Sequence, residues 1–337
     1  MQRIAYRLKA GNLQNLKQHQ EQLPDPEADE VTIEVKSIGL NFADVFAIWG
    51  LYGATPKGSF IPGLEYAGRV LRVGEKVKSV KVGDAIMGVT RFGGYCTHLN
   101  IDHRYVIPLP DDWDFPTGAA YLVQVLTAYY GLLELGNLKE GQTVLIHSAA
   151  GGVGTLANRI AKCYNAFTIG TVGREAKVAF CKAEGYDEVI VRSANFAADL
   201  KRAMGDRELN IVMECIGGKI FEAGFEALAP EGRSIIYGAA RYASPGNRPN
   251  YPQLLWKHFT RPKIDPQKLA ELNKGLLGFN LIYLYERAPL MHDLLQRIQS
   301  LGIAPPHVGH QFPFDELPEA IRLFQTGKSI GKIVVNT

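Results

Sequence analysis

A glycine-rich turn between a strand pattern and a helix pattern most constrains the fold of this chain. The apolar run Val144 to His147 is typical of a buried strand, and the turn Ser148 to Gly154 leads from it directly into a helical pattern. In such a turn Gly151 lets the backbone approach a pyrophosphate and Gly154 lets the helix pack closely on the strand. Ala149 replaces the first glycine of the motif, so tight packing alone is an alternative explanation. More strands and helices alternate after it, which favours a parallel, doubly wound sheet that binds a dinucleotide.

The pattern before residue 110 is different. Short β-type runs are separated there by glycine or proline, which predicts a mostly antiparallel β domain. The α/β pattern begins near residue 116 with one long helix predicted over 118–135, and it ends with a buried strand predicted over 275–284. The segment 241–268 is rich in proline and aromatic residues and is predicted to be an elaborated loop. A β-type tail suggests that both ends of the chain belong to one domain.

Composition excludes several classes of protein. The net charge of +3 has no accompanying basic cluster, so we expect no nucleic-acid partner. No apolar run reaches the roughly 18 residues that span a bilayer, and charges near the start argue against a signal peptide. The four cysteines lie far apart and form no paired motif, which indicates buried thiols in a reducing compartment. We therefore expect a cytoplasmic protein.

The next strand pattern bears on which dinucleotide is bound. An NAD site usually has an acidic residue about 20 residues past the glycine turn, but here the strand ends at Gly173 and Arg174, with Lys177 close behind. These cations, with Arg192 after the following strand, suit a 2′-phosphate and predict NADPH. Alternatively, Arg174 and Lys177 are solvated residues at a helix start, and the nearby Glu175 leaves NAD possible.

Several segments together resemble the medium-chain dehydrogenase/reductase superfamily, in its zinc-independent quinone oxidoreductase branch, which includes proteins similar to vesicle amine transport protein 1. The segments that carry the resemblance are "GLNFADVFAIWGLY", "FIPGLEYAGRV", "HSAAGGVG", "GTVGREAK" and "GKIVV". The resemblance implies an α/β protein with two domains and a homodimer. A GroES-like β-rich catalytic domain would comprise 1–122 and 285–337, and a Rossmann NADP-binding domain would comprise 123–284.

The resemblance also addresses metal binding. Zinc-dependent members carry a cysteine where this chain has Asn41, a His-Glu pair where it has Leu64-Glu65, and a third ligand near Val123. A catalytic zinc needs three protein ligands, which Glu65 alone cannot supply. We therefore expect no zinc.

Without a metal, hydride transfer must stabilise negative charge in another way. A quinone or an α,β-unsaturated carbonyl delocalises that charge, and hydrogen-bond donors can stabilise the developing oxyanion. The resemblance places Asn41, Asp44 and Tyr52 at this site, with Tyr52 as the donor and Asp44 as an organising group. The alternative is structural, because Asn41 and Asp44 have the spacing of a loose helix capping box and Tyr52 could pack in a loop.

The same resemblance gives an expected cofactor site at the carboxyl edge of the sheet. Thr127 would lie near the nicotinamide, the segment Phe279 to Leu281 would reach its amide, and Gly217 and Gly238 would end neighbouring strands. The expected cofactor-binding residues are Thr127, Ala150, Gly151, Gly152, Val153, Gly154, Gly173, Arg174, Lys177, Arg192, Gly217, Gly238, Phe279, Asn280 and Leu281.

Two other functions remain open from the sequence. Basic and aromatic residues alternate in 241–268, for example Trp256 and Lys257, which could favour contact with a membrane surface or a partner by an NADPH-binding protein with little turnover. A site lid or a dimer contact is the favoured explanation of this segment. Reduction of an enoyl thioester is the closer alternative to the reduction of a small quinone or enone.

Overall fold

The predicted parallel sheet is present and has six strands in the order β11-β10-β9-β12-β13-β14. The computed structural model describes every residue from Met1 to Thr337. The strands are β9 Thr143–His147, β10 Phe167–Val172, β11 Glu188–Val191, β12 Leu209–Glu214, β13 Leu228–Ile236 and β14 Gly275–Gly278. The helices between them are α4 Gly152–Lys162, α5 Val178–Ala183, α6 Phe196–Met204 and α7 Lys219–Ala227. The strand order reverses between β9 and β12, which in such sheets is where ligands bind.

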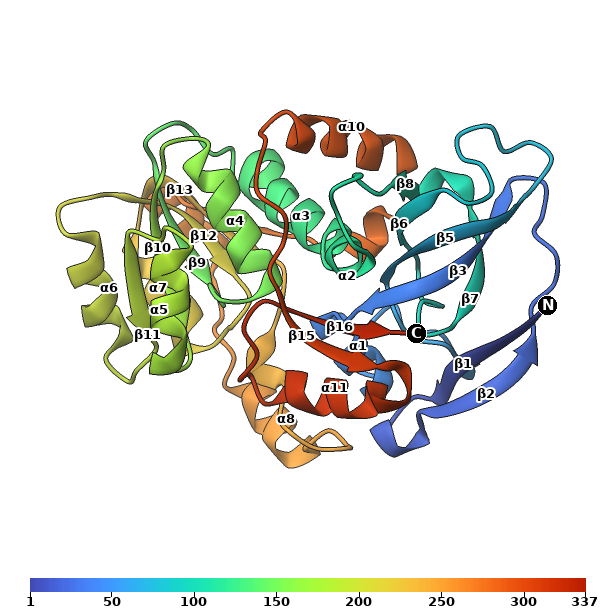
Figure 1. The fold of residues 1–337 in the computed structure, drawn as a ribbon. Coiled ribbons are helices and arrows are strands. Elements are labelled where there is room, and N and C mark those ends of the chain that lie inside the picture. Colours follow the sequence, from blue (N-terminus) through green and yellow to red (C-terminus); the bar gives the residue numbers. More distant parts are fainter.

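The other lobe of the molecule is mostly antiparallel, as predicted, and only the β15–β16 pair is parallel (Figure 1). One sheet has the order β15-β16-β3-β5-β6-β8, with β7 also paired to β3, and a smaller sheet has the order β2-β1-β4. The strands are β1 Gln2–Lys9, β2 Lys17–Gln22, β3 Glu30–Gly39, β4 Ser59–Phe60, β5 Glu65–Val73, β6 Ala85–Val89, β7 His98–Asp102, β8 Val106–Pro108, β15 Val308–Pro313 and β16 Lys332–Asn336. Because β16 pairs with β3, the end of the chain lies beside its first forty residues.

The helix predicted over 118–135 is interrupted. Its place is taken by α2 Phe115–Ala119, α3 Leu122–Tyr129 and a π-helical turn Tyr130–Leu135. The break comes where the carbonyl of Ala119 packs against Gly39 of β3, so closely that a Cβ on Gly39 would lie 1.9 Å from that oxygen. A tertiary contact therefore overrides a helical pattern that is continuous in the sequence. Helix α10, Ala288–Gln299, packs against α3 (Figure 1).

The prediction of a loop over 241–268 is wrong. This segment contains α8, Tyr251–Phe259, and the start of α9, Pro266–Leu272. The side chains of Asn250 and Asp265 cap the two helices, and a proline occupies an early position in each, where its missing N–H costs nothing. Both prolines therefore lie in the first turn of a helix and do not indicate a loop.

The prediction of one buried strand over the whole of 275–284 is also wrong. Only Gly275–Gly278 is a strand, and it lies half-buried at the edge of the parallel sheet. A 3-10 turn, Leu281–Leu284, follows it, so the segment Phe279 to Leu281 is not part of a strand.

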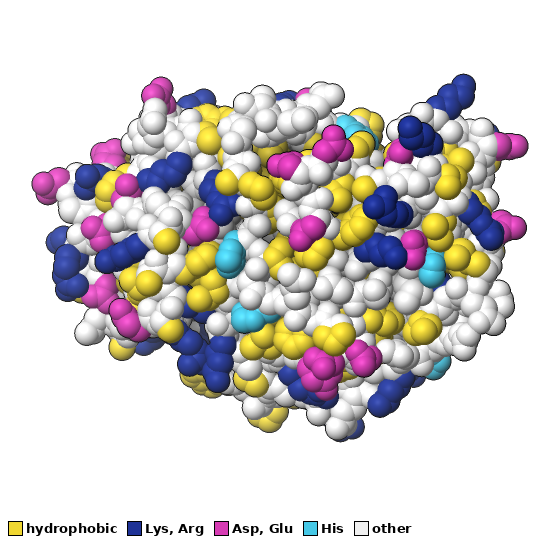
Figure 2. Space-filling model, viewed as in Figure 1, with side chains coloured by type: hydrophobic (Ala, Val, Ile, Leu, Met, Phe, Trp, Pro, Cys, Tyr) yellow, Lys and Arg dark blue, Asp and Glu magenta, His cyan; other side chains and the backbone are white.

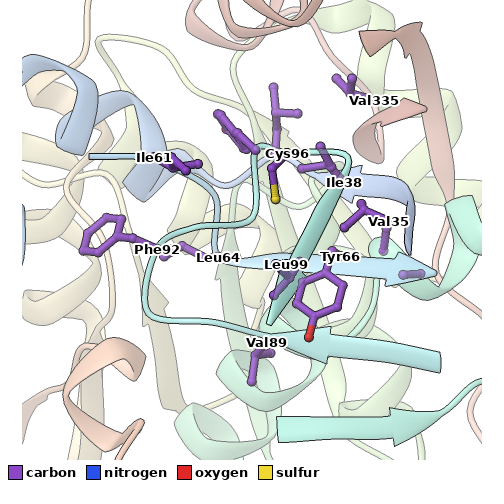
Figure 3. Close-up of a cluster of buried hydrophobic side chains, with 14 of the residues drawn as sticks. Val35, Ile38, Ile61, Leu64, Tyr66, Val89, Phe92, Cys96, Leu99 and Val335 are labelled. Atoms are coloured by element: carbon purple, nitrogen blue, oxygen red, sulfur yellow. The ribbon is translucent and has the colours of Figure 1, made fainter. Parts of the chain in front are cut away.

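Three apolar clusters form the core. The largest fills the antiparallel lobe, and Figure 3 shows part of it around Tyr66 and Leu99. The other two lie on the parallel sheet. All four cysteines are free thiols, and Cys163 is exposed, contrary to the expectation that all four are buried. On the face shown in Figure 2, acidic and basic side chains are interspersed. None of the helices combines the length and the apolar character that crossing a membrane requires.

Candidate functional site

A cleft of about 470 Å³ lies where the parallel sheet meets the antiparallel lobe. It is lined by the glycine turn, the ends of β10 and β13, the segment after β14, helix α10, and the loop between β16 and α11, Leu317–Gln325. The lobe opposite contributes the start of helix α1, Phe42–Trp49, and the loop that follows it. Of the predicted site residues, the cleft brings together Asn41, Tyr52, Thr127, Ala150, Gly151, Gly152, Val153, Gly154, Gly173, Lys177, Arg192, Gly238, Phe279, Asn280 and Leu281. It does not include Asp44, Arg174 or Gly217.

The glycine turn follows β9 and opens α4. A Cβ on Gly154 would lie 2.5 Å from the carbonyl oxygen of Ser148, so only glycine fits there. A Cβ on Gly151 would have one neighbour, at 3.2 Å, which leaves this backbone open to a ligand. Ala149, the departure from the motif, is fully buried against Gly170 of β10, where a Cβ would lie 2.9 Å from the Cβ of Ala149. The extra methyl group is accommodated by a glycine on the neighbouring strand.

Two cations stand at the end of β10. The Arg192 guanidinium lies over Gly173, where a Cβ would be 3.1 Å from Nη2, and its Nη1 donates to the backbone carbonyl and hydroxyl of Thr171. Lys177 Nζ donates to the carbonyl of Ser329 at 2.6 Å, and burial lowers the pKa of Lys177. Neither forms an ion pair with a carboxylate, so both charges are available to an anion in the cleft.

A buried polar cluster lies at the junction of the two lobes. Lys332 Nζ forms an ion pair with Glu65 Oε1 and donates to Asn41 Oδ1 at 3.0 Å. Asn41 Nδ2 donates to Glu65 Oε1 at 2.9 Å, and Gln124 Nε2 donates to Asn41 Oδ1 at 2.7 Å. The second carboxylate oxygen of Glu65 accepts the backbone N–H of Val123 at 3.1 Å. Asn41 and Glu65, which the resemblance aligned with zinc ligands, are thus linked to each other and to an ammonium group.

Sequence reasoning missed Lys332 and Gln124 in this cluster. Both line the cleft and both are buried, and burial lowers the pKa of Lys332 while Glu65 opposes that shift. The sequence does contain a signal for Lys332. This lysine is the first residue of the apolar strand β16, and a charge buried with such a strand needs a partner. No group of three or more His, Cys, Asp and Glu side chains that could hold a metal ion occurs in the structure. Zinc independence itself stays a prediction.

The side chains of Asn41 and Asp44 at the start of α1 were predicted either to line the site or to cap the helix. Asp44 Oδ2 accepts the backbone N–H of Asn41 at 2.8 Å and the hydroxyl of Tyr95 at 2.9 Å. Asp44 therefore makes its half of the capping box, whereas the side-chain oxygen of Asn41 accepts hydrogen bonds from Gln124 and Lys332. Asp44 Oδ1 has no partner, and burial raises the pKa of this carboxyl to about 7. Asp44 is buried and does not line the cleft.

Tyr52 lies in the cleft on the loop after α1. Its hydroxyl donates to Asn280 Oδ1 at 2.7 Å, and its ring packs edge-on against Phe92. Burial raises the pKa of Tyr52 to about 12, so the hydroxyl keeps its proton at neutral pH. This contact joins two predicted site residues that are 228 positions apart.

The Asp44 carboxyl predicts a particular dependence of stability on pH. An unfolded aspartate loses its proton near pH 4, whereas folded Asp44 holds it to about pH 7. Between these values the folded state binds the extra proton, so the contribution of Asp44 to the free energy of unfolding falls by about 1.4 kcal/mol per pH unit as the pH rises. Asp44→Asn should remove this slope in denaturant titrations at pH 4 to 7.

Asp111→Asn is the matched control, because Asp111 is exposed, and it should keep the wild-type slope. Equal slopes in wild type and Asp44→Asn would show that Asp44 is ionised throughout this range.

Comparison with known proteins agrees with this architecture. Residues 27–111 match the alcohol dehydrogenase GroES-like domain, and residues 152–264 match the family described as zinc-binding dehydrogenase. The chain is 30% identical to the human synaptic vesicle membrane protein VAT-1 homolog over 315 residues, covering 93% of this chain and 80% of that protein.

Two solved structures are similar over nearly the whole chain. A quinone oxidoreductase from Pseudomonas syringae is 26% identical with a TM-score of 0.84, covering 99% of this chain and 100% of that chain. A mycobacterial protein solved with NADPH has the same identity, TM-score and coverage. The chain belongs to the medium-chain dehydrogenase/reductase superfamily of oxidoreductases, in its quinone oxidoreductase-like branch among the VAT-1-like proteins.

Proposed function

We propose that this protein is an NADPH-dependent reductase of quinones or α,β-unsaturated carbonyl compounds. The observation that carries the proposal is the content of a single cleft, which holds the Lys177 and Arg192 cations, the glycine turn and the Tyr52–Asn280 pair. The complex of a mycobacterial relative with NADPH and the likeness to a quinone oxidoreductase support it.

The residues present fit NADPH along the length of the cleft. The open backbone at Gly151 and the start of α4 suit the pyrophosphate. Lys177 and Arg192 suit the 2′-phosphate, because both are cationic and Gly173, which lies beside Arg192 and also lines the cleft, carries no side chain to exclude it. Arg174, which the sequence placed in this group, does not line the cleft.

The groups on the other side of the cleft suit a carbonyl oxygen. When bound, NADPH supplies a hydride to the substrate carbon. The neutral Tyr52 hydroxyl exchanges its acceptor on Asn280 for the substrate oxygen and donates a hydrogen bond as negative charge develops there. Before the substrate binds, the hydrogen bond to the Asn280 amide oxygen fixes the orientation of the Tyr52 hydroxyl. Because the pKa of Tyr52 is raised to about 12, we assign it the role of hydrogen-bond donor and take the final proton from water.

The lysine of the polar cluster has a supporting role in this scheme. The Lys332–Glu65 pair holds Asn41 in one orientation and fixes the start of α3 through the N–H of Val123. Thr127 lies one turn further along α3, on the wall of the cleft, with its hydroxyl donating to the carbonyl of Val123. The cluster therefore sets the position of the wall against which the nicotinamide would lie.

Turnover with a substrate panel tests the reaction directly. Purified protein should oxidise NADPH in the presence of quinones or short enones, and Tyr52→Phe should lower kcat by about 100-fold through loss of the donor to the oxyanion. Absorbance at the NADPH band measures both. Turnover of enoyl thioesters alone would replace the proposed substrate class, and no turnover with any acceptor would contradict the proposal.

The cofactor assignment has its own test. Lys177→Met keeps the apolar stem but removes the charge, so it should weaken NADPH binding by about 10- to 100-fold and leave the Kd for NADH nearly unchanged. Fluorescence titration measures both constants. Arg174→Met is the matched control, since it removes a neighbouring cation that lies outside the cleft, and it should leave both constants near wild type. Equal weakening of both cofactors by Lys177→Met would contradict a phosphate contact.

A further inference from the structure

A second cavity, of about 1020 Å³, adjoins the cleft and is not explained by cofactor binding. Of the 17 residues that line it, 13 are hydrophobic, and we call this cavity the annex. Its walls come from α1, the loop that carries Tyr52, the end of β13, the segment after β14, and α8, the helix that the sequence did not predict.

The annex and the cleft share part of their walls. Tyr52, Asn280 and Phe279 line both, as do Phe42 and Tyr237. The Tyr52 hydroxyl and its acceptor Asn280 Oδ1 therefore stand at the boundary between the two spaces. A molecule whose carbonyl oxygen accepts from Tyr52 has its remaining atoms directed either toward the cofactor or into the annex.

The chemistry of the annex walls differs sharply from that of the cleft. No lysine, arginine, aspartate or glutamate lines the annex, whereas Lys177, Arg192 and Lys332 line the cleft. The few polar groups in the annex are tyrosine hydroxyls, His258 and Asn280. Walls of this kind favour an apolar guest and give no partner to a phosphate.

Helix α8 forms the outer wall of the annex and leaves it open to solvent. Leu254 is half-buried there, and Leu255 also lines the annex while 58% of its surface remains exposed. Because Leu255 both lines the annex and is exposed to solvent, a flexible chain can enter the annex along α8 without crossing the cleft.

We propose that the annex binds the apolar tail of the substrate, so that this protein acts on quinones or enones that carry an alkyl or prenyl-like chain. The inference rests on the proposed function for the position of the reacting carbonyl. The tail lies between α1 and α8, and Tyr52 and Asn280 mark the point where the polar head ends and the tail begins. The geometry makes α8 a determinant of specificity.

A homologous series measures the tail contribution. The kcat/KM for 2-alkyl-1,4-benzoquinones should rise about two- to fourfold per methylene, because each buried CH₂ contributes a roughly constant free energy. The Kd of redox-inert 2-alkyl-1,4-dimethoxybenzenes, measured by calorimetry without NADPH, should fall by the same factor per methylene. Both trends should flatten once the annex is filled.

Variants of α8 locate the tail. Leu254→Asp should flatten the dependence on chain length in both measurements, since it places a charge in the apolar wall. Leu255→Asp should do the same, and because Leu255 is largely exposed, this variant avoids a folding defect. Trp256→Ser is the control, because Trp256 is on the same helix, is 64% exposed and does not line the annex, and it should keep the wild-type trend.

The outcomes separate this inference from the proposed function. A flat response to chain length in the wild type, or an unchanged trend in both aspartate variants, would overturn the annex as the tail site even if quinones are reduced. Chain-dependent binding of the dimethoxybenzenes that both aspartate variants abolish, with no oxidation of NADPH by any quinone, would support the tail site and overturn the proposed reaction.

Discussion

The ion pair between Lys332 and Glu65 is the interaction on which the arrangement of the cleft depends. Both side chains are almost fully buried, so each charge has lost its water and needs the other. Breaking such a pair by removing one partner typically costs about 3–5 kcal/mol, because the remaining charge is left uncompensated. The pair joins β16, the last strand, to β5 and, through Val123, to the start of α3. The pair thus fixes two segments that line the cleft, β16 and the start of α3, to β5, which lies outside the lining.

The charge of the lining side chains changes from one end of the cleft to the other. Cations at the end of β10 attract a phosphate, the ion pair at the lobe junction is internally balanced, and the walls beyond Tyr52 carry no charge. In the proposed function, the 2′-phosphate of NADPH binds at the cationic end and the apolar part of the acceptor binds at the uncharged end. Tyr52, whose pKa is raised by burial to about 12, lies at the boundary between the cleft and the annex, and a neutral donor suits an oxygen that gains negative charge only during reaction.

Much of the cofactor side of the cleft could be predicted from the sequence, because its residues lie close together along the chain. The glycine turn, the strand before it and the helix after it are consecutive, Lys177 comes shortly after Gly173 at the end of β10, and Arg192 directly follows β11. The sequence signals that Lys332 needs a partner but not which one, because Asn41, Glu65 and Lys332 come together only when β16 pairs with β3. Helix α8 was not predicted because the proline and aromatic content of 241–268 indicated a loop, although the proline of α8 occupies an early helical position after the cap residue Asn250.

Transfer of the hydride itself is the most direct test of the account. NADPH deuterated at C4 of the nicotinamide, in each stereochemical form, is incubated with the protein and an α,β-unsaturated ketone. The product is then analysed by NMR. We expect deuterium at the β carbon of the saturated ketone from only one of the two forms, because a cleft that fixes the nicotinamide presents a single face to the substrate. A reduced product without deuterium from either form would show that the carbon does not receive its hydride from NADPH, and would contradict the account.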